Sequence, residues 1–92
     1  MPENKKTKPS WYVYILECAD NTLYTGITVD VKRRINEHNN DNKLAAKYTR
    51  VRRPVKLVYK EALKSRSLAA KREAEIKKLK RNEKETLCNQ LI

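Results

Sequence analysis

Glycine, phenylalanine and cysteine are scarce in this chain: its 92 residues include one glycine, no phenylalanine and two cysteines. Two cysteines are too few for a disulfide framework, and Cys18 and Cys88 lack the spacing of metal ligands, so we expect free thiols in a reducing compartment. No apolar run approaches the roughly 20 residues that cross a bilayer, and the N-terminal stretch MPENKKTKPS lacks the apolar segment of a signal peptide. We therefore expect a soluble, cytoplasmic protein with no membrane partner.

Acidic residues are also scarce, especially in the second half. The chain has 22 Lys and Arg against 11 Asp and Glu, a net charge of +11, and residues 43–92 hold all of this excess because residues 1–42 have six of each sign. Such a one-sided field favours a polyanion, either nucleic acid or an anionic membrane. A membrane-binding helix would need an apolar face rich in Trp, Phe or Leu, yet the single Trp, Trp11, lies in the neutral half. Nucleic acid is the better candidate.

The length allows one small domain with one modest core. Residues 1–10 are polar, include two prolines and show no apolar periodicity, so we expect a disordered basic tail there and a single domain over residues 11–92. We expect this domain to be a monomer.

The order of apolar patterns predicts a small α+β domain. A hairpin over residues 11–28 is followed by a helix over 30–39 capped by Asp30, a strand over 55–60, and a long helix from Ser65 or Ser67 to about residue 80, with a short C-terminal helix possible from 82. Residues 43–53 show no clear period. We therefore expect a three-stranded antiparallel sheet flanked by helices, in the order ββαβα.

Some residues would be unusual in a plain scaffold. Tyr14 and Tyr24 lie on the two paired strands, and the only glycine, Gly26, follows closely; a glycine inside a strand usually marks a bulge or a close approach of another group. Arg34 and His38 are four residues apart on the apolar side of the first helix, where a guanidinium needs an anion. Each feature also has a purely structural explanation, as core packing, a salt bridge or a buried histidine.

Two carboxylates stand out among the cations of the long helix. Glu73 and Glu75 lie on opposite borders of its apolar stripe, so periodicity does not choose between them. A carboxylate in a surface that binds phosphate repels it, and holding a divalent metal ion is one task that compensates for this repulsion. An ordinary ion pair along the helix is the alternative.

Together these residues resemble the GIY-YIG nuclease superfamily. The resemblance rests on the segments Tyr12-Val-Tyr14 and Tyr24-Thr-Gly26, followed by Arg34 and His38, and it covers about residues 11–85. The segments Lys47-Tyr-Thr-Arg50 and Arg72-Glu-Ala-Glu-Ile-Lys77 make it closest to the small stand-alone UPF0213, or YhbQ-like, members.

The resemblance implies a divalent-metal-dependent, structure-selective endonuclease that hydrolyses phosphodiester bonds in DNA during repair or processing, with DNA favoured over RNA. It implies one Mg²⁺ or Mn²⁺ on Glu73, a clamp on phosphate by Arg34, proton transfer through Tyr14 with Tyr24 beside it, and a hydrogen bond from His38. The residues that we expect to bind nucleic acid are Lys47, Tyr48, Arg50, Arg52, Arg53 and Lys77.

Two other functions remain open at this stage. A non-catalytic nucleic-acid-binding module with the same fold would explain the charge and the aromatic residues equally well. A basic ribosome-associated protein would bind RNA without any metal. A mere binder has no reason to place Glu73 and Arg34 together, so their positions separate these alternatives from a nuclease.

Overall fold

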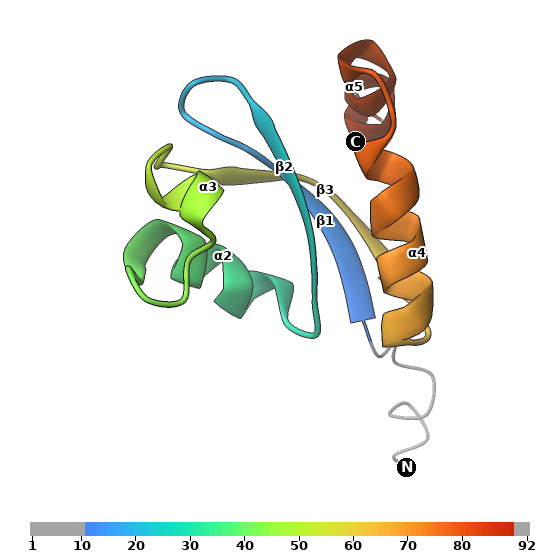
Figure 1. Ribbon diagram of the computed structural model, residues 1–92, viewed down its shortest axis with the longest axis horizontal. Coiled ribbons are helices and arrows are strands. Elements are labelled where there is room, and N and C mark those ends of the chain that lie inside the picture. Colours follow the sequence, from blue (N-terminus) through green and yellow to red (C-terminus); the bar gives the residue numbers. More distant parts are fainter. Residues whose placement is uncertain (1–10, 90–92) are drawn as a thin grey trace.

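The computed structural model describes residues 11–89, and within this range the chain forms three strands and four helices (Figure 1). In chain order these are β1 (Trp11–Glu17), β2 (Leu23–Thr28), α2 (Val31–Asn40), α3 (Lys47–Arg50), β3 (Lys56–Leu63), α4 (Arg66–Lys77) and α5 (Arg81–Asn89). The expected tail over residues 1–10 lies outside the described residues. No helix between residues 11 and 89 is long and apolar enough to span a membrane.

The sheet is antiparallel, with β1 at its centre in the order β2, β1, β3. The aromatic and β-branched residues of β1 suit this central position, and Val13, Tyr14, Ile15 and Leu16 are all buried. Asn21 closes the hairpin with a φ of 68°, a conformation that asparagine tolerates better than most residues. The predicted α+β class and three-stranded antiparallel sheet are confirmed.

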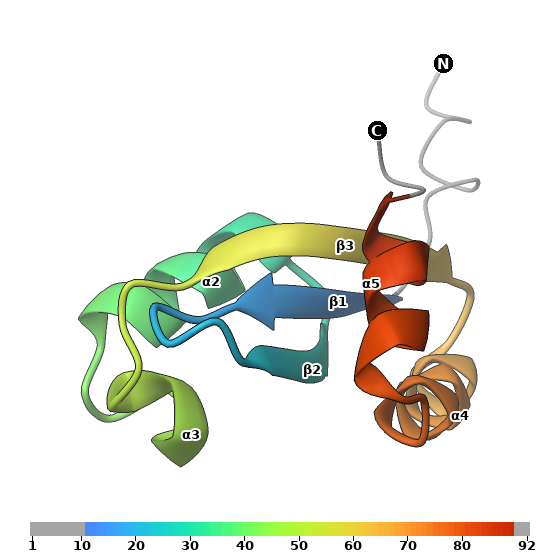
Figure 2. The same ribbon diagram turned by 90° about the horizontal axis from the view of Figure 1, so that it is seen from above.

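Helices cover both faces of this sheet, which explains why β1 is apolar throughout rather than alternating. Tyr14 and Leu16 face α2, where Ile35 packs against them, while Val13 and Ile15 face α4, where they contact Ile76. Figure 1 shows α2 and α3 on one side of the strands and α4 and α5 on the other. Seen from above, α3 and α4 lie on either side of the edge strand β2 (Figure 2).

Local side-chain caps fix where the two longer helices begin. The Asp30 carboxylate accepts a hydrogen bond from the backbone N–H of Arg33, 3.0 Å away, and the Ser65 hydroxyl accepts one from Leu68, 3.1 Å away. Each cap satisfies one N–H that the helix itself leaves free. Asp30 was the expected cap of the first helix, and Ser65 rather than Ser67 begins the second.

Helix α3 is the one element in the described range that the sequence pattern did not predict. Asp41 ends α2 and turns the chain, because its carboxylate accepts hydrogen bonds from the backbone N–H groups of Lys43 and Leu44 at 2.8 and 2.9 Å. A helix of four residues follows at Lys47. Such a short helix has too few turns to show a hydrophobic period.

Candidate active site and nucleic-acid interface

The only glycine of the chain lies directly against a buried tyrosine. Tyr14 on β1 pairs with Gly26 on β2, and a Cβ atom at Gly26 would lie 2.6 Å from Tyr14 Oη and 2.8 Å from its Cζ. Any side chain at this position would therefore push the tyrosine aside. The glycine leaves room for the Tyr14 ring, which is 1% exposed.

His38 lies fully buried between Tyr14 and Thr49. Its Nε2 is 2.8 Å from Tyr14 Oη, and its Nδ1 is 2.6 Å from Thr49 Oγ1. Burial, with the positive charge of Arg34 adding to it, lowers the pKa of His38 to about 4. The imidazole is therefore neutral at neutral pH, and one of its nitrogens has a lone pair available to accept a proton.

Arg34 lies at the border of the same cluster, as its place on the helix predicted. Its Nη1 donates to Glu37 Oε1 at 2.9 Å and to the Leu44 carbonyl oxygen at 2.7 Å. Its charge nonetheless acts on both Tyr14 and His38, lowering the pKa of each. Both of these hydrogen bonds come from a single nitrogen of a guanidinium that carries five N–H donors.

Burial dominates the acidity of Tyr14. Burial raises the pKa of the phenol, the neighbouring Tyr24 adds to the rise, and the opposing effect of Arg34 is smaller, so that the pKa is about 12. Arg34 is the nearby cation that favours the phenolate, but its effect does not outweigh the loss of solvent. Tyr14 is therefore a neutral hydrogen-bond donor in this state of the protein.

The structure distinguishes the two glutamates of α4. Glu73, whose side chain is 23% exposed, is close enough to Tyr14 for its charge to raise the pKa of the phenol. Glu75 is 52% exposed and instead binds Arg72, which also donates to Glu61 on β3 at 2.9 Å. Of the two, Glu73 is thus the carboxylate whose charge acts on Tyr14.

A metal ion at this cluster would have one protein carboxylate. Residues 11–89 contain no group of three or more His, Cys, Asp or Glu side chains that could hold a metal together. The Glu73 carboxylate lies 3.2 Å from the ammonium group of Lys77, so a cation already lies beside it. A single oxygen-donor carboxylate suits a hard cation such as Mg²⁺, which keeps several waters and takes further oxygens from a phosphate.

Aromatic rings continue the cluster toward the surface along α3. Tyr24 lies 6.5 Å from Tyr14 and 5.3 Å from His38, measured between ring centroids. On its outer side Tyr48 stacks on Tyr24 at 6.0 Å, and the guanidinium of Arg52 lies 3.8 Å above the Tyr48 ring. Arg52 also pairs with Asp20 at 3.1 Å. This stack connects α3 to the hairpin that carries Tyr14.

The expected phosphate-binding cations have different surroundings. Lys47 is exposed at the start of α3, Arg50 is exposed at its end, and Lys77 pairs with Glu73 on α4. Arg53 instead turns inward: its Nε donates to the His38 carbonyl oxygen at 2.7 Å, and its Nη1 donates to Asn42 Oδ1 at 2.9 Å. Arg53 therefore connects α2 to the chain that enters β3.

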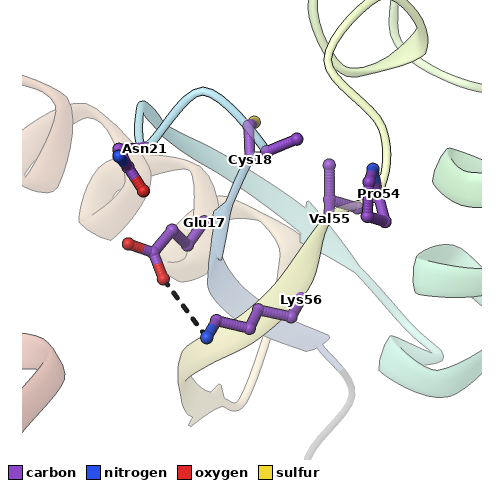
Figure 3. A pocket seen from close by; sticks show the side chains of 7 residues that line it. Glu17, Cys18, Asn21, Pro54, Val55 and Lys56 are labelled. Atoms are coloured by element: carbon purple, nitrogen blue, oxygen red, sulfur yellow. Dashed lines mark ion pairs between the residues drawn. The ribbon is translucent and has the colours of Figure 1, made fainter.

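A shallow depression of about 270 Å³ lies elsewhere, where β1 leads into the hairpin turn and β3 begins (Figure 3). Its charged groups, Glu17 and Lys56, pair with each other at 3.5 Å. Burial raises the pKa of the Cys18 thiol beside it, so the thiol is protonated and unreactive. The depression has no group suited to the chemistry of a phosphodiester.

The described fold thus brings Tyr14, Tyr24 and His38 into contact, with Arg34 beside them and Glu73 near enough for its charge to act on Tyr14. These are the five residues predicted for catalysis. They come from β1, β2, α2 and α4, which are distant in the sequence. Thr49 also belongs to the cluster and was missed, although it lies inside the segment Lys47-Tyr-Thr-Arg50 that supports the resemblance. A single threonine in a segment without a hydrophobic period gives no hint of its role in the sequence. Only its contact with His38 shows that Thr49 is part of the cluster.

Comparisons with known proteins identify the family. The family model for the GIY-YIG catalytic domain matches residues 10–86. A UPF0213 protein of Desulfotalea psychrophila is 58% identical over 80 residues, which are 87% of this chain and 72% of the relative. A UPF0213 protein of Syntrophus aciditrophicus is also 58% identical, over 86% of this chain and 90% of the relative.

Two solution NMR structures share the fold. The UPF0213 protein BH0048 from Bacillus halodurans is 48% identical with a TM-score of 0.55, over 87% of this chain and 83% of that one. The protein EF2693 from E. faecalis is 40% identical with a TM-score of 0.57, over 87% of this chain and 84% of that one. The chain therefore belongs to the GIY-YIG family and, within it, to the UPF0213 proteins.

Proposed function

We propose that this protein is an endonuclease that hydrolyses phosphodiester bonds in DNA, depends on Mg²⁺ or Mn²⁺, selects its substrate by structure, and acts in DNA repair or processing. The observation that carries the proposal is the cluster in which Tyr14, packed against Gly26, contacts His38 and feels the charges of Arg34 and Glu73. A nuclease needs a proton acceptor, a phosphate clamp and a carboxylate at one place. A binding module has no use for a carboxylate there.

Proton transfer is assigned to Tyr14 and His38. The Tyr14 hydroxyl contacts a histidine nitrogen at 2.8 Å, and the histidine is neutral. Tyr14 accepts a proton from the attacking water as it passes its own proton to Nε2 of His38. The phenol never has to exist as a free phenolate at neutral pH, which its pKa of about 12 would disfavour.

Arg34 and Glu73 are assigned to the charged parts of the reaction. Arg34 would bind the non-bridging oxygens of the scissile phosphate through N–H groups that its bonds to Glu37 and Leu44 leave over, a role that a planar guanidinium suits. Glu73 would hold one Mg²⁺ or Mn²⁺, and when bound the ion supplies positive charge for the leaving oxygen. Lys77, which now pairs with Glu73, is then available to bind a neighbouring phosphate.

The position of β2 supports nucleic acid as the partner. This edge strand carries Tyr24 and Gly26, and the cation-bearing elements α3 and α4 lie on either side of it (Figure 2). A polyanion that crosses β2 meets Lys47 on one side and Lys77 on the other. Helix α3 has four residues, too few for a recognition helix in the major groove. We therefore assign selectivity to the shape of the DNA backbone rather than to the base edges.

A cleavage survey tests the proposal. Duplex, branched and single-stranded DNA, with RNA of the same sequences, is incubated with the protein and Mg²⁺ or Mn²⁺, and in parallel with excess chelator. We expect cleavage of at least one DNA structure, its loss with the chelator, and its loss in Tyr14→Phe, which keeps the ring but has no proton to transfer. Binding without cleavage of any substrate, with either metal, would favour the non-catalytic module instead.

A further inference from the structure

The hydrogen bonds around His38 determine which of its nitrogens carries the proton. Thr49 Oγ1 lies 3.1 Å from the Ala46 carbonyl oxygen, to which it donates, and 2.6 Å from His38 Nδ1. A hydroxyl has one hydrogen, so with that hydrogen on the carbonyl the oxygen can only accept from Nδ1. Nδ1 is then protonated, and Nε2 carries the lone pair that receives the Tyr14 hydroxyl at 2.8 Å.

The opposite tautomer satisfies fewer groups. With the proton on Nε2, the histidine would donate to Tyr14 Oη and Thr49 would have to donate to Nδ1. The Tyr14 hydroxyl hydrogen would then have no acceptor that we find within residues 11–89, although this side chain is 1% exposed. A buried donor without a partner is unfavourable, so the arrangement with three hydrogen bonds in series is preferred.

We propose that Thr49 is a positioning residue that fixes the Nδ1–H tautomer of His38, so that Nε2 is free to take the proton of Tyr14. The effect of this tautomer on catalysis rests on the proposed function. The tautomer itself rests on the hydrogen bonds alone. Thr49 and His38 are both fully buried, so water has no access to supply the missing hydrogen bond. The low pKa of His38 agrees with a neutral ring.

Nitrogen-15 NMR tests the tautomer directly, because His38 is the only histidine of the chain. Long-range proton–nitrogen spectra of the full chain at neutral pH distinguish a protonated, pyrrole-like nitrogen from an unprotonated, pyridine-like one. We expect Nδ1 to be pyrrole-like and Nε2 pyridine-like in the parent. The reverse assignment, or averaged shifts on both nitrogens, would overturn the proposal whether or not the protein cleaves anything.

Variants at Thr49 then test whether this side chain is the cause. Thr49→Val keeps the shape and removes the hydroxyl, and we expect its nitrogen shifts to move toward a mixture of tautomers, while Thr49→Ser restores the parent spectrum. Thr25→Val is the matched control, since Thr25 is a buried threonine that pairs with Ile15 and faces α4. Unchanged shifts in a folded Thr49→Val protein would contradict the proposal. If that variant does not fold, the parent and Thr49→Ser spectra still decide it.

On the proposed reaction, Thr49→Val should lower kcat on the order of tenfold, a part of the 10²–10⁴-fold that a positioned proton acceptor typically contributes. KM should stay close to the parent value because Thr49 does not reach the surface. Thr49→Ser should recover most of kcat. A rise in KM with kcat unchanged would show that Thr49 acts on binding and would overturn the assignment. A parent without any cleavage contradicts the proposed function, and the NMR result then stands by itself.

Discussion

The side chain of Tyr14 lies across Gly26, and this contact limits what can replace the glycine. In Gly26→Ala the added carbon would lie within 3 Å of the phenol ring, so Tyr14 must move and its hydrogen bond to His38 must lengthen or break. We expect a loss of about 1–3 kcal/mol in the free energy of unfolding, typical of an overpacked core. Urea denaturation of the variant measures it.

A double-mutant cycle isolates the cause of that loss. In a Tyr14→Ala background the ring is gone, so adding Gly26→Ala should cost little more. The coupling between the two positions should account for most of the single-mutant effect. An equal cost in both backgrounds would mean that the glycine serves the strand backbone rather than the tyrosine.

His38 makes stability depend on pH. Its pKa is about 4 in the folded protein, against an ordinary value of 6.5, so the unfolded chain binds a proton more readily. Above pH 6.5 the ring is neutral in both states and the free energy of unfolding has its full value. As the pH falls from 6.5 toward 4, protonation of the unfolded chain lowers that free energy by about 3 kcal/mol in total. Urea denaturation at intervals between pH 7 and 4 measures this loss. His38→Gln, which does not titrate, should show a flatter profile, and matching profiles in both proteins would contradict the assignment.

At the residue scale, the sequence was most informative where side-chain types are rare. One glycine, one histidine and two strand tyrosines indicated the cluster, and the geometry brings them together. A helical wheel places both Glu73 and Glu75 at a border of the apolar stripe, so periodicity did not choose between them, and Glu73 was selected by the family resemblance. Thr49 and the inward turn of Arg53 depend on contacts between segments distant in sequence, which no local pattern reveals.

At the scale of elements, strands and capped helices followed from local signals. The aromatic and β-branched runs formed the expected strands. Asp30 caps the helix that it was expected to cap, and Ser65 is the one of the two candidate serines that caps the long helix. Helix α3 was missed because its position depends on the Asp41 turn and on Thr49 packing against His38. Tertiary contacts therefore place this helix, and through it the Tyr48 stack.

Asn39 makes the contact that holds α2 against the start of β3. Its side-chain amide donates to the Val55 carbonyl oxygen at 2.9 Å, and its carbonyl oxygen accepts from the Val55 N–H at 2.8 Å. Asn39→Ala removes both bonds and should lower the free energy of unfolding by about 1–3 kcal/mol, because two backbone groups lose their partner. Thermal or urea unfolding measures this change.

The neighbouring Asn40 offers a matched control for that experiment. Among the described residues, its side chain bonds only to Asn36, also in α2 and at an exposed position. Asn40→Ala should therefore change stability by a few tenths of a kcal/mol at most. Similar losses in the two variants would show that the bridge to Val55 is not what stabilises the junction.

At the scale of the whole molecule, the basic second half of the chain includes α3 and α4, the helices that lie on either side of β2. Lys43, in the turn before α3, and Lys47, at the start of α3, are exposed, and we find no ion pair for them within residues 11–89. If they neutralise phosphates, each replacement by Ala should flatten the slope of log K against log salt by about 0.9 for duplex DNA. Binding titrations over a range of salt concentrations measure the slopes.

Lys56→Ala is the control for this prediction. It removes the same charge from β3 at the depression of Figure 3, away from β2. Its slope should match that of the parent protein. If all three variants shift the slope equally, the phosphate contacts are not concentrated beside β2, and net charge alone governs binding.

The most direct test of the proposed nuclease compares Glu73→Gln with Glu75→Gln in one cleavage assay with Mg²⁺ or Mn²⁺. Glutamine keeps the size of the side chain and removes the charge that a hard cation requires. We predict that Glu73→Gln abolishes cleavage while DNA binding persists or tightens, and that Glu75→Gln cleaves like the parent, since it loses only a surface ion pair with Arg72. Cleavage that survives in Glu73→Gln, or that is lost in Glu75→Gln instead, would contradict the account.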